Sequence, residues 1–309
     1  MKIIKNISVF FCIVASTSLI NAHPNGNIIV TKNGCVLWPY VSPVGDIAHH
    51  ASVMLWDQES KPRLFLKSEY EASDFFLYTK DNDVYIIERK FVNSKNRFES
   101  RILKTSTNFE KPKVIWPWFD DQWYIGVGGF KMLSDSELIF TKYPNIYSLK
   151  KDKNPTIYFN FSSAINKMRP VANNKLLLLG ENTAWLTDER GEIIKQWNNL
   201  IEELQGDIPL NSNSIRDIDY TNGNLLIAYW GKRSFELIDT NNNRKTLIQQ
   251  QKHWVPHWVA YLDDVPLLFS SFLDFENGFT EDLKKTTIIP KFVMYRKRKS
   301  INVWEYEIN

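Results

Sequence analysis

Short apolar runs separated by polar turns recur along the chain. Five segments share one pattern, in which an apolar stretch is followed by an Asp or Asn, two further residues and a second apolar run. The Asp or Asn always stands three residues before the second run begins, and these positions are Asp81, Asp135, Asn173, Asn222 and Asp264. Asp and Asn tolerate the left-handed backbone of a tight turn and bond their own main chain there. Each segment is therefore predicted to be a β-hairpin.

The second run of each segment consists of consecutive Val, Ile, Leu or Phe residues, as at 84–87, 176–179 and 267–269. Strands of this kind are buried on both faces, so they are expected at the centre of packed sheets. A further hairpin with alternating apolar and polar residues follows each segment, as at 102–116 and 235–248. This alternation is typical of outer strands with one wetter face.

Two successive hairpins make a four-stranded antiparallel sheet, and a tandem series of such sheets is the arrangement of a β-propeller. The five Asp or Asn positions are separated by 54, 38, 49 and 42 residues, which is typical of propeller blades. Residues 27–30 and 35–38, with a hairpin around Asp57, predict one earlier blade. We expect an all-β propeller of six four-stranded antiparallel blades, or seven if two have been merged. An open sandwich or a jelly roll is the alternative.

Segment 185–193, with the sequence WLTDERGEI, resembles the outer hairpin of six-bladed propellers of the NHL and lactonase-like kind. The resemblance covers these residues alone and implies the fold only, because no catalytic signature accompanies it. The WD dipeptide pattern, the sialidase Asp-box and the kelch double glycine are not visible in their usual form.

The first 22 residues have the pattern of a secretory signal peptide. Lys2 and Lys5 precede an apolar run at 7–15, and a more polar stretch ends in Ala22. Cys12 lacks the small neighbours that precede a lipoprotein cysteine, so a lipid anchor is not expected. We predict an exported protein, periplasmic or extracellular, in which residues 23–309 form a single propeller domain.

Composition and charge narrow the function classes. The 309 residues are 43% hydrophobic and 24% charged, as in ordinary globular proteins. Removal of residues 1–22 lowers the formal net charge from +3 to +1, so no overall basic field favours nucleic acid or anionic membranes. After processing Cys35 is the one remaining cysteine, so an intramolecular disulfide is excluded. No later run approaches 18 apolar residues, which argues against integral membrane contact and for a soluble mature protein. We expect this protein to be a monomer.

Aromatic residues gather in segments expected to be loops at the mouth of the propeller channel, namely 116–124, 229–233 and 251–258. Tryptophan rings there suit sugar rings or the anchor residues of a protein partner, although a Trp can equally wedge between blades as core. Arginines near the starts of inner strands could hold anions. The candidate ligand-binding residues are Trp118, Trp123, Tyr124, Arg169, Arg216, Asp217, Trp230, Arg233, His253 and Trp254.

Acid–base chemistry would need two groups with separated pKa values at the mouth. Asp120, Asp121 and His257 are the candidates. A metal site built on His253 and His257 is not expected, because Pro256 disfavours the helix that their spacing requires. With no nucleophile–base motif and no phosphate loop, no cofactor is expected either. The leading hypothesis is an exported propeller that binds a protein or glycan partner without chemistry of its own. The alternative is a hydrolase or lyase acting on a sugar, lactone or peptide.

Overall fold

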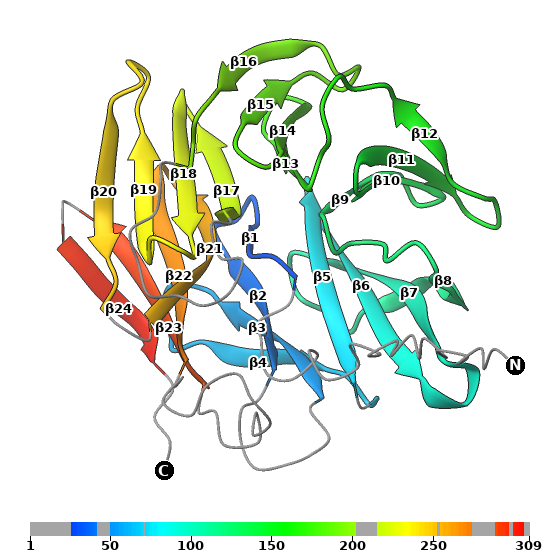
Figure 1. Ribbon diagram of the computed structural model, residues 1–309. Coiled ribbons are helices and arrows are strands. Elements are labelled where there is room, and N and C mark those ends of the chain that lie inside the picture. Colours follow the sequence, from blue (N-terminus) through cyan, green and yellow to red (C-terminus); the bar gives the residue numbers. More distant parts are fainter. Residues whose placement is uncertain are drawn as a thin grey trace, which may run out of the picture.

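The residues that the structure describes form six four-stranded antiparallel sheets (Figure 1). The computed structural model describes residues 26–41, 50–70, 72–201, 215–251, 254–273, 288–296 and 299–305. Each sheet consists of four strands that are consecutive in sequence, and we number these blades 1 to 6 in chain order. The predicted propeller with six blades is confirmed.

The strands of blades 1 to 3 are β1 (Ile29–Val30), β2 (Val36–Val41), β3 (Ala51–Trp56), β4 (Arg63–Lys67), β5 (Ser73–Lys80), β6 (Asp83–Val92), β7 (Arg97–Ser106), β8 (Lys113–Asp120), β9 (Phe130–Ser134), β10 (Glu137–Lys142), β11 (Asn145–Lys150) and β12 (Thr156–Phe159). A short 3-10 helix, η1 (Asn93–Lys95), joins β6 to β7.

The strands of blades 4 to 6 are β13 (Lys167–Val171), β14 (Lys175–Leu179), β15 (Ala184–Thr187), β16 (Ile193–Trp197), β17 (Ile215–Thr221), β18 (Asn224–Tyr229), β19 (Ser234–Ile238), β20 (Arg244–Gln249), β21 (Trp254–Leu262), β22 (Val265–Leu273), β23 (Ile288–Arg296) and β24 (Lys299–Glu305). Among the described residues, no helix is long and apolar enough to cross a membrane.

The first strand of each blade is the innermost one. These strands contact one another in the cyclic order β1, β5, β9, β13, β17, β21 and back to β1. In Figure 1, β1, β5, β9, β13 and β17 accordingly converge near the centre. Because successive strands are antiparallel, the innermost strands start on the same face as the loops between second and third strands and the loops between blades. We call this side the mouth face.

The second strand of each blade is buried on both faces, as the consecutive apolar runs predict. In β6, Val84 and Ile86 pack towards blade 1, whereas Tyr85 and Ile87 pack towards blade 3. This alternation repeats in the other central strands, because successive side chains of a strand point to opposite faces. It produces six apolar clusters, one between each pair of neighbouring blades.

Hairpin turns opposite the mouth face have the predicted chemistry at four of the five positions. Asp81, Asn173, Asn222 and Asp264 have φ values of 54°, 60°, 44° and 64°, which is the left-handed region. Asp135 lies in a turn beside a register shift between Glu137 and Leu138. Its carboxylate accepts hydrogen bonds from the Tyr85 hydroxyl and the Lys104 ammonium of blade 2.

Within the described residues, blades 1 and 6 share no sheet, and side chains join them. Blade 1 contains only strands from the beginning of the chain and blade 6 only strands from its end. The interface contains Trp38, Trp258 and Phe269, and the rings of Trp258 and Phe269 have centroids 4.8 Å apart. The Trp258 indole also donates to the Gly26 carbonyl at 2.9 Å. Burial of aromatic surface therefore stabilises the contact between blade 1 and blade 6.

Candidate functional site

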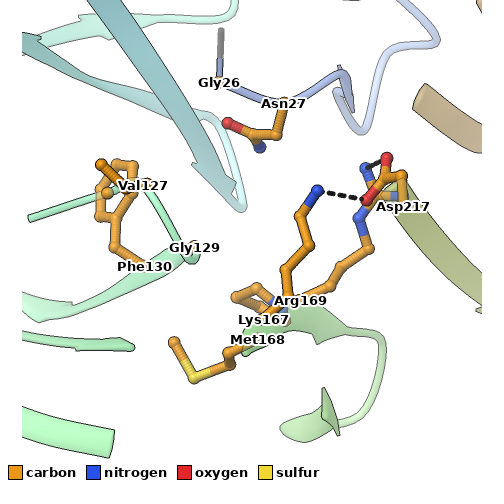
Figure 2. A pocket seen from close by; sticks show the side chains of 11 residues that line it. Gly26, Asn27, Val127, Gly129, Phe130, Lys167, Met168, Arg169 and Asp217 are labelled. Carbon is orange, nitrogen blue, oxygen red and sulfur yellow. Dashed lines mark ion pairs between the residues drawn. The ribbon is translucent and has the colours of Figure 1, made fainter. Parts of the chain in front are cut away.

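A pocket opens at the mouth face, where the innermost strands begin (Figure 2). Its empty volume is about 320 Å³, and the loop before β9 together with the starts of β13 and β17 forms its wall. The lining residues are Gly26, Asn27, Gly126, Val127, Gly129, Phe130, Lys167, Met168, Arg169, Pro170 and Asp217. They come from blades 1, 3, 4 and 5 and their preceding loops, so the site depends on the closed ring.

Two glycines allow the loop 121–129 to approach the axis closely. Gly129 has a φ of 98°, and a Cβ there would lie 1.9 Å from the Met168 carbonyl oxygen. Gly126 has a φ of 92°, and its Cβ would meet the Phe76 ring at 2.7 Å. Only glycine adopts this backbone at such contact without strain.

Arg169 is the central charged group of the site. Its guanidinium donates to the carbonyl oxygens of Ile28 at 2.7 Å, Ile218 at 3.1 Å and Val259 at 2.5 Å. These acceptors belong to or adjoin the innermost strands of blades 1, 5 and 6, whereas Arg169 belongs to blade 4. One buried side chain, 10% exposed, thus connects four blades across the channel.

Two carboxylates of β17 pair this strand with β21. Asp217 accepts the Val259 N–H at 3.1 Å, and Asp219 accepts the Tyr261 N–H at 2.9 Å. Because Asp217 and Asp219 are two residues apart, both point to the same side of the strand. Burial raises the pKa of Asp219, while the Arg169 guanidinium at 3.5 Å opposes that effect. The amide of Asn27 has a similar role on the other side of the ring, where it bonds both N–H and C=O of Leu77.

Lys167 brings an ammonium group to the pocket. Its Nζ lies 3.0 Å from Asp217 Oδ1 and donates to the Arg216 carbonyl at 2.8 Å, and Figure 2 shows this ion pair. Burial lowers the pKa of Lys167, although the Asp217 carboxylate works in the opposite direction. The Lys167 side chain is 17% exposed, so it still borders solvent.

An exposed aromatic patch adjoins the pocket. Trp123, Tyr124, Val127, Lys142 and Tyr143 form it, and we call it the aromatic rim. Tyr124, Val127 and Tyr143 are 47%, 52% and 68% exposed. Lys142 Nζ lies 4.6 Å from the Trp123 ring centroid and 5.9 Å from that of Tyr124, and it donates to the Gln122 carbonyl. Val127 belongs to both rim and pocket, which makes the two surfaces continuous.

Three further predicted ligand residues cluster on blade 5. The Arg216 guanidinium lies 4.0 Å from the Trp230 ring centroid. The ring centroids of Trp230 and His257 of β21 are 5.1 Å apart. Trp230 is 3% exposed and His257 is 5% exposed, so both rings are part of the packing. Arg233 lies in the same turn as Trp230, with a φ of 51°.

The remaining aromatic candidates lie in strands. The expectation that 116–120 belongs to a mouth loop is wrong, because β8 continues to Asp120. Trp118 is therefore on the outermost strand of blade 2, where Lys90 and Arg101 lie over its ring. Segment 254–258, also expected in a loop, belongs to β21, and Trp254 is half-buried there. His253 lies outside the described residues.

The structure does not bring the three candidate catalytic residues together. Asp120 ends the outermost strand of blade 2, about 14 Å from the innermost strand at three strand spacings, and pairs with Arg97 at 2.7 Å. Asp121 is 1% exposed and accepts hydrogen bonds from the Ser100 hydroxyl and the Ile125 N–H. Burial raises the pKa of Asp121. His257 lies on blade 6, at a register shift in the pairing of β21 with β22.

Sequence reasoning did not identify Lys167, Lys142 or Tyr143 as site residues. Lys167 starts an innermost strand two residues before Arg169, so strand alternation places both on the channel side. The two-residue spacing of Lys167 and Arg169 could therefore have identified Lys167 from the sequence once the strand was assigned. In the part of the chain that the structure describes, no group of three or more His, Cys, Asp or Glu residues could hold a metal ion.

The chain matches no protein-family model and no curated protein sequence. Among solved structures, the β-propeller domain of the Trilobed protease from Pyrococcus furiosus, described as having an open velcro topology, has a TM-score of 0.50 at 8% identity, covering 92% of this chain and 98% of that one. A streptogramin B lyase has a TM-score of 0.49 at 15% identity, with 80% and 91% covered. Virginiamycin B lyase from Staphylococcus aureus with quinupristin has a TM-score of 0.48 at 14% identity, with 81% and 92% covered. At these identities the likeness concerns the fold alone, and the chain is a β-propeller of four-stranded antiparallel blades.

Proposed function

We propose that this protein is exported after removal of residues 1–22 and that its single propeller domain, residues 23–309, binds a partner through the aromatic rim without chemistry of its own. A protein is the partner class that the rim favours. Its exposed area includes the two rings of Tyr124 and Tyr143, and Tyr is enriched at protein interfaces and among their hot spots.

The observation that carries this proposal is the position of the exposed hydrophobic side chains. Of the large hydrophobic residues exposed in the described part of the chain, three lie in loops of the mouth face: Tyr124 and Val127 before β9, and Tyr143 between β10 and β11. The others lie on outermost strands, at Leu64, Val114, Ile157, Ile193 and Ile194. Loops that connect rigid blades are also where binding residues concentrate.

The test compares a rim variant with a variant of equal size on the outer strands. Tyr124→Asn combined with Tyr143→Ser removes the rim rings, and Asn suits the positive φ of 57° at position 124. Leu64→Ser combined with Ile157→Ser is the control, because both residues are more than half exposed away from the mouth. Each protein is immobilised and screened against a displayed peptide library and a glycan array.

We expect the wild-type protein and the control to enrich the same peptides, and the rim variant to lose at least tenfold in affinity for them. Removal of two central aromatic anchors has this effect at protein interfaces. Enrichment of glycans instead would replace the protein partner by a carbohydrate. Equal binding by the rim variant would disprove the role of the rim.

The hydrolase or lyase alternative has a separate test. Turnover would be measured on a panel of sugar, lactone and peptide substrates, with and without chelator. Activity that is lost in Asp120→Asn and His257→Ala would support the enzyme and contradict a purely binding function.

A further inference from the structure

One loop contains three members of the aromatic rim. Residues 121–129, which we call the rim loop, connect β8 to β9 and include Trp123, Tyr124 and Val127. Tyr124 has a φ of 57°, in the left-handed region that bulky side chains rarely adopt. Such a backbone persists only where surrounding contacts hold it, and it occurs most often at functional sites. The contacts that hold the rim loop therefore bear on binding.

The buried carboxylate of Asp121 attaches the rim loop to blade 2. Its Oδ1 accepts the Ile125 N–H at 3.1 Å, and its Oδ2 accepts the hydroxyl of Ser100 on β7 at 2.6 Å. The Asp121 N–H donates to the Phe98 carbonyl at 2.9 Å. Because Ile125 directly follows Tyr124, these bonds fix the chain next to the strained residue.

The buried charges around Asp121 include one carboxylate in excess. Arg89 of β6 is the cation whose charge acts on Asp121, but its guanidinium forms an ion pair with Asp74 of β5 at 2.6 Å. The side chains of Arg89 and Asp74 are 9% and 3% exposed, so this pair is buried as well. A buried carboxylate without a cation of its own is unfavourable when ionised, and uptake of a proton relieves that cost.

The other charged groups close to the rim loop lie at the surface. Asp120 pairs with Arg97 at 2.7 Å, and their side chains are 47% and 44% exposed. The ammonium of Lys142, on β10, lies 4.6 Å from the Trp123 ring centroid. Arg89 is thus the buried cation that faces Asp121 among the described residues, and Asp74 already pairs with it.

Burial raises the folded-state pKa of Asp121, although its hydrogen bond with Ser100 opposes this effect. In an arrangement of the rim loop that exposes Asp121 to water, the pKa would return to its ordinary value of 3.8. The closed arrangement therefore binds the proton more tightly than an open one, so protonation favours closure. As pH rises from 3.8 to the raised pKa, opening should become about tenfold more frequent for each pH unit, and it should then level off.

We infer that Asp121 is a positioning residue that holds the rim loop in its binding arrangement, and that proton uptake by its carboxylate strengthens this hold. Acidification thus favours partner capture by the rim. The statement on capture rests on the proposed function, whereas the pH dependence of the loop does not.

Hydrogen exchange of glycine amides measures opening of the rim loop without a partner. The chain has 12 glycines, so 15N-glycine labelling gives a simple correlation spectrum. The Gly129 N–H donates to the Gly126 carbonyl at 2.9 Å within the rim loop. The Gly180 N–H donates to the Thr183 carbonyl at 2.9 Å in a mouth-face loop of blade 4, and it is the reference amide. Exchange rates from pH 4 to 7 are divided by the rate of an unfolded peptide at the same pH.

In the wild type, the corrected exchange of Gly129 should rise with pH and level off above the raised pKa of Asp121, whereas that of Gly180 should stay constant. Asp121→Asn retains an acceptor for the Ile125 N–H without a charge, so its Gly129 profile should be flat. Asp120→Asn is the matched control, because it removes the neighbouring exposed carboxylate, and it should keep the wild-type profile. A flat wild-type profile would overturn the inference even if Asp121→Asn fails to fold, and so would an unchanged rise in the folded variant.

Capture is then measured with end-blocked library peptides that depend on the rim and contain no Asp, Glu or His, so that pH does not alter the peptide. The wild type should bind them more tightly at pH 4.5 than at pH 7, in proportion to the closed fraction of the rim loop. Asp121→Asn should bind them equally at both pH values. Equal binding by the wild type at both would overturn the control of capture by Asp121.

The two measurements separate this inference from the proposed function. A pH-dependent rim loop in a protein that captures no peptide would reject the proposed function and leave the role of Asp121 in the loop standing. Capture by the rim with a flat Gly129 profile would retain the proposed function and reject the inference.

Discussion

The guanidinium of Arg169 donates to the main-chain oxygen of Ile28 at 2.7 Å, although the two residues are 141 positions apart in sequence. The same side chain bonds carbonyls of blades 5 and 6. Arg169 therefore supports ring closure from the axis, while Trp38, Trp258 and Phe269 support it from the blade interface.

Replacing Arg169 by Met should lower the free energy of unfolding by about 3–5 kcal/mol, because Asp219 loses its guanidinium partner and buried Asp217 keeps Lys167 as its one cationic partner among the described residues. Urea denaturation followed by tryptophan fluorescence measures the change. Arg190→Met is the control, since Arg190 is exposed and should change stability by less than about 0.5 kcal/mol. Similar losses in both variants would contradict the axial role of Arg169.

Trp258→Ala should destabilise the junction of blades 1 and 6. Loss of a large buried aromatic side chain costs about 3–5 kcal/mol, and the Gly26 carbonyl also loses its donor. Hydrogen exchange should accelerate most in β1, β2, β21 and β22, because local opening follows local contact loss. Trp185→Ala, at the junction of blades 3 and 4, is the matched control and should accelerate exchange there instead. An identical pattern of hydrogen exchange in both variants would contradict the expectation that Trp258→Ala acts at the junction of blades 1 and 6.

Asp121→Asn tests the pH dependence of stability. Burial raises the folded-state pKa of Asp121 above its ordinary value of 3.8, so the native state holds this proton more tightly than the unfolded chain does. Its contribution is therefore fully present below pH 3.8 and is lost as pH rises through the raised pKa. Asn retains the acceptor for Ile125 N–H and can donate to Ser100. We expect the variant to be more stable than the wild type at pH 7 and to lack this decline, measured by denaturation from pH 3.5 to 7. A decline of unchanged size would exclude Asp121 as its source.

Within the aromatic rim, two rings should differ in their effect on folding. Trp123 packs against the cluster between blades 2 and 3 and lies 5.4 Å from the Tyr147 ring. Trp123→Ala should therefore cost about 2 kcal/mol. Tyr143 is 68% exposed, so Tyr143→Ala should change stability by less than about 0.5 kcal/mol. Thermal and urea unfolding distinguish the two, and equal effects would contradict this division of the rim.

Much of the architecture could be predicted from local patterns. The runs at 84–87 and 176–179 indicated central strands, and alternate residues of each do pack against opposite neighbours. Turn residues such as Asn173 and Asp264 were identified because their left-handed conformation is a property of a few adjacent residues. The limits of β8 were missed, since the Pro and Trp residues at 116–118 suggested a loop. Pro117 lies on an outermost strand, where the ladder tolerates proline.

The candidate site was predicted only in part. Arg169 and Asp217 were identified from their positions near strand starts, and the structure brings them together at 3.4 Å. Lys167 was not singled out, because its role depends on the Asp217 carboxylate 50 residues later in the chain. Asp121 and Trp230 were candidates because carboxylates and tryptophans are common in functional sites, yet both side chains are buried. Burial at such positions depends on neighbouring blades and cannot be obtained from one segment.

The sequence by itself determined the repeated unit, its turns and the two-sided burial of its central strands, because each depends on residues a few positions apart. The tertiary structure alone decided which side chains meet at the axis and which rings remain exposed. Closing six blades into a ring brings Ile28, Arg169, Ile218 and Val259 to one point. Contacts between residues so distant in sequence follow from the geometry of the ring. The local periodicity of apolar residues does not specify them.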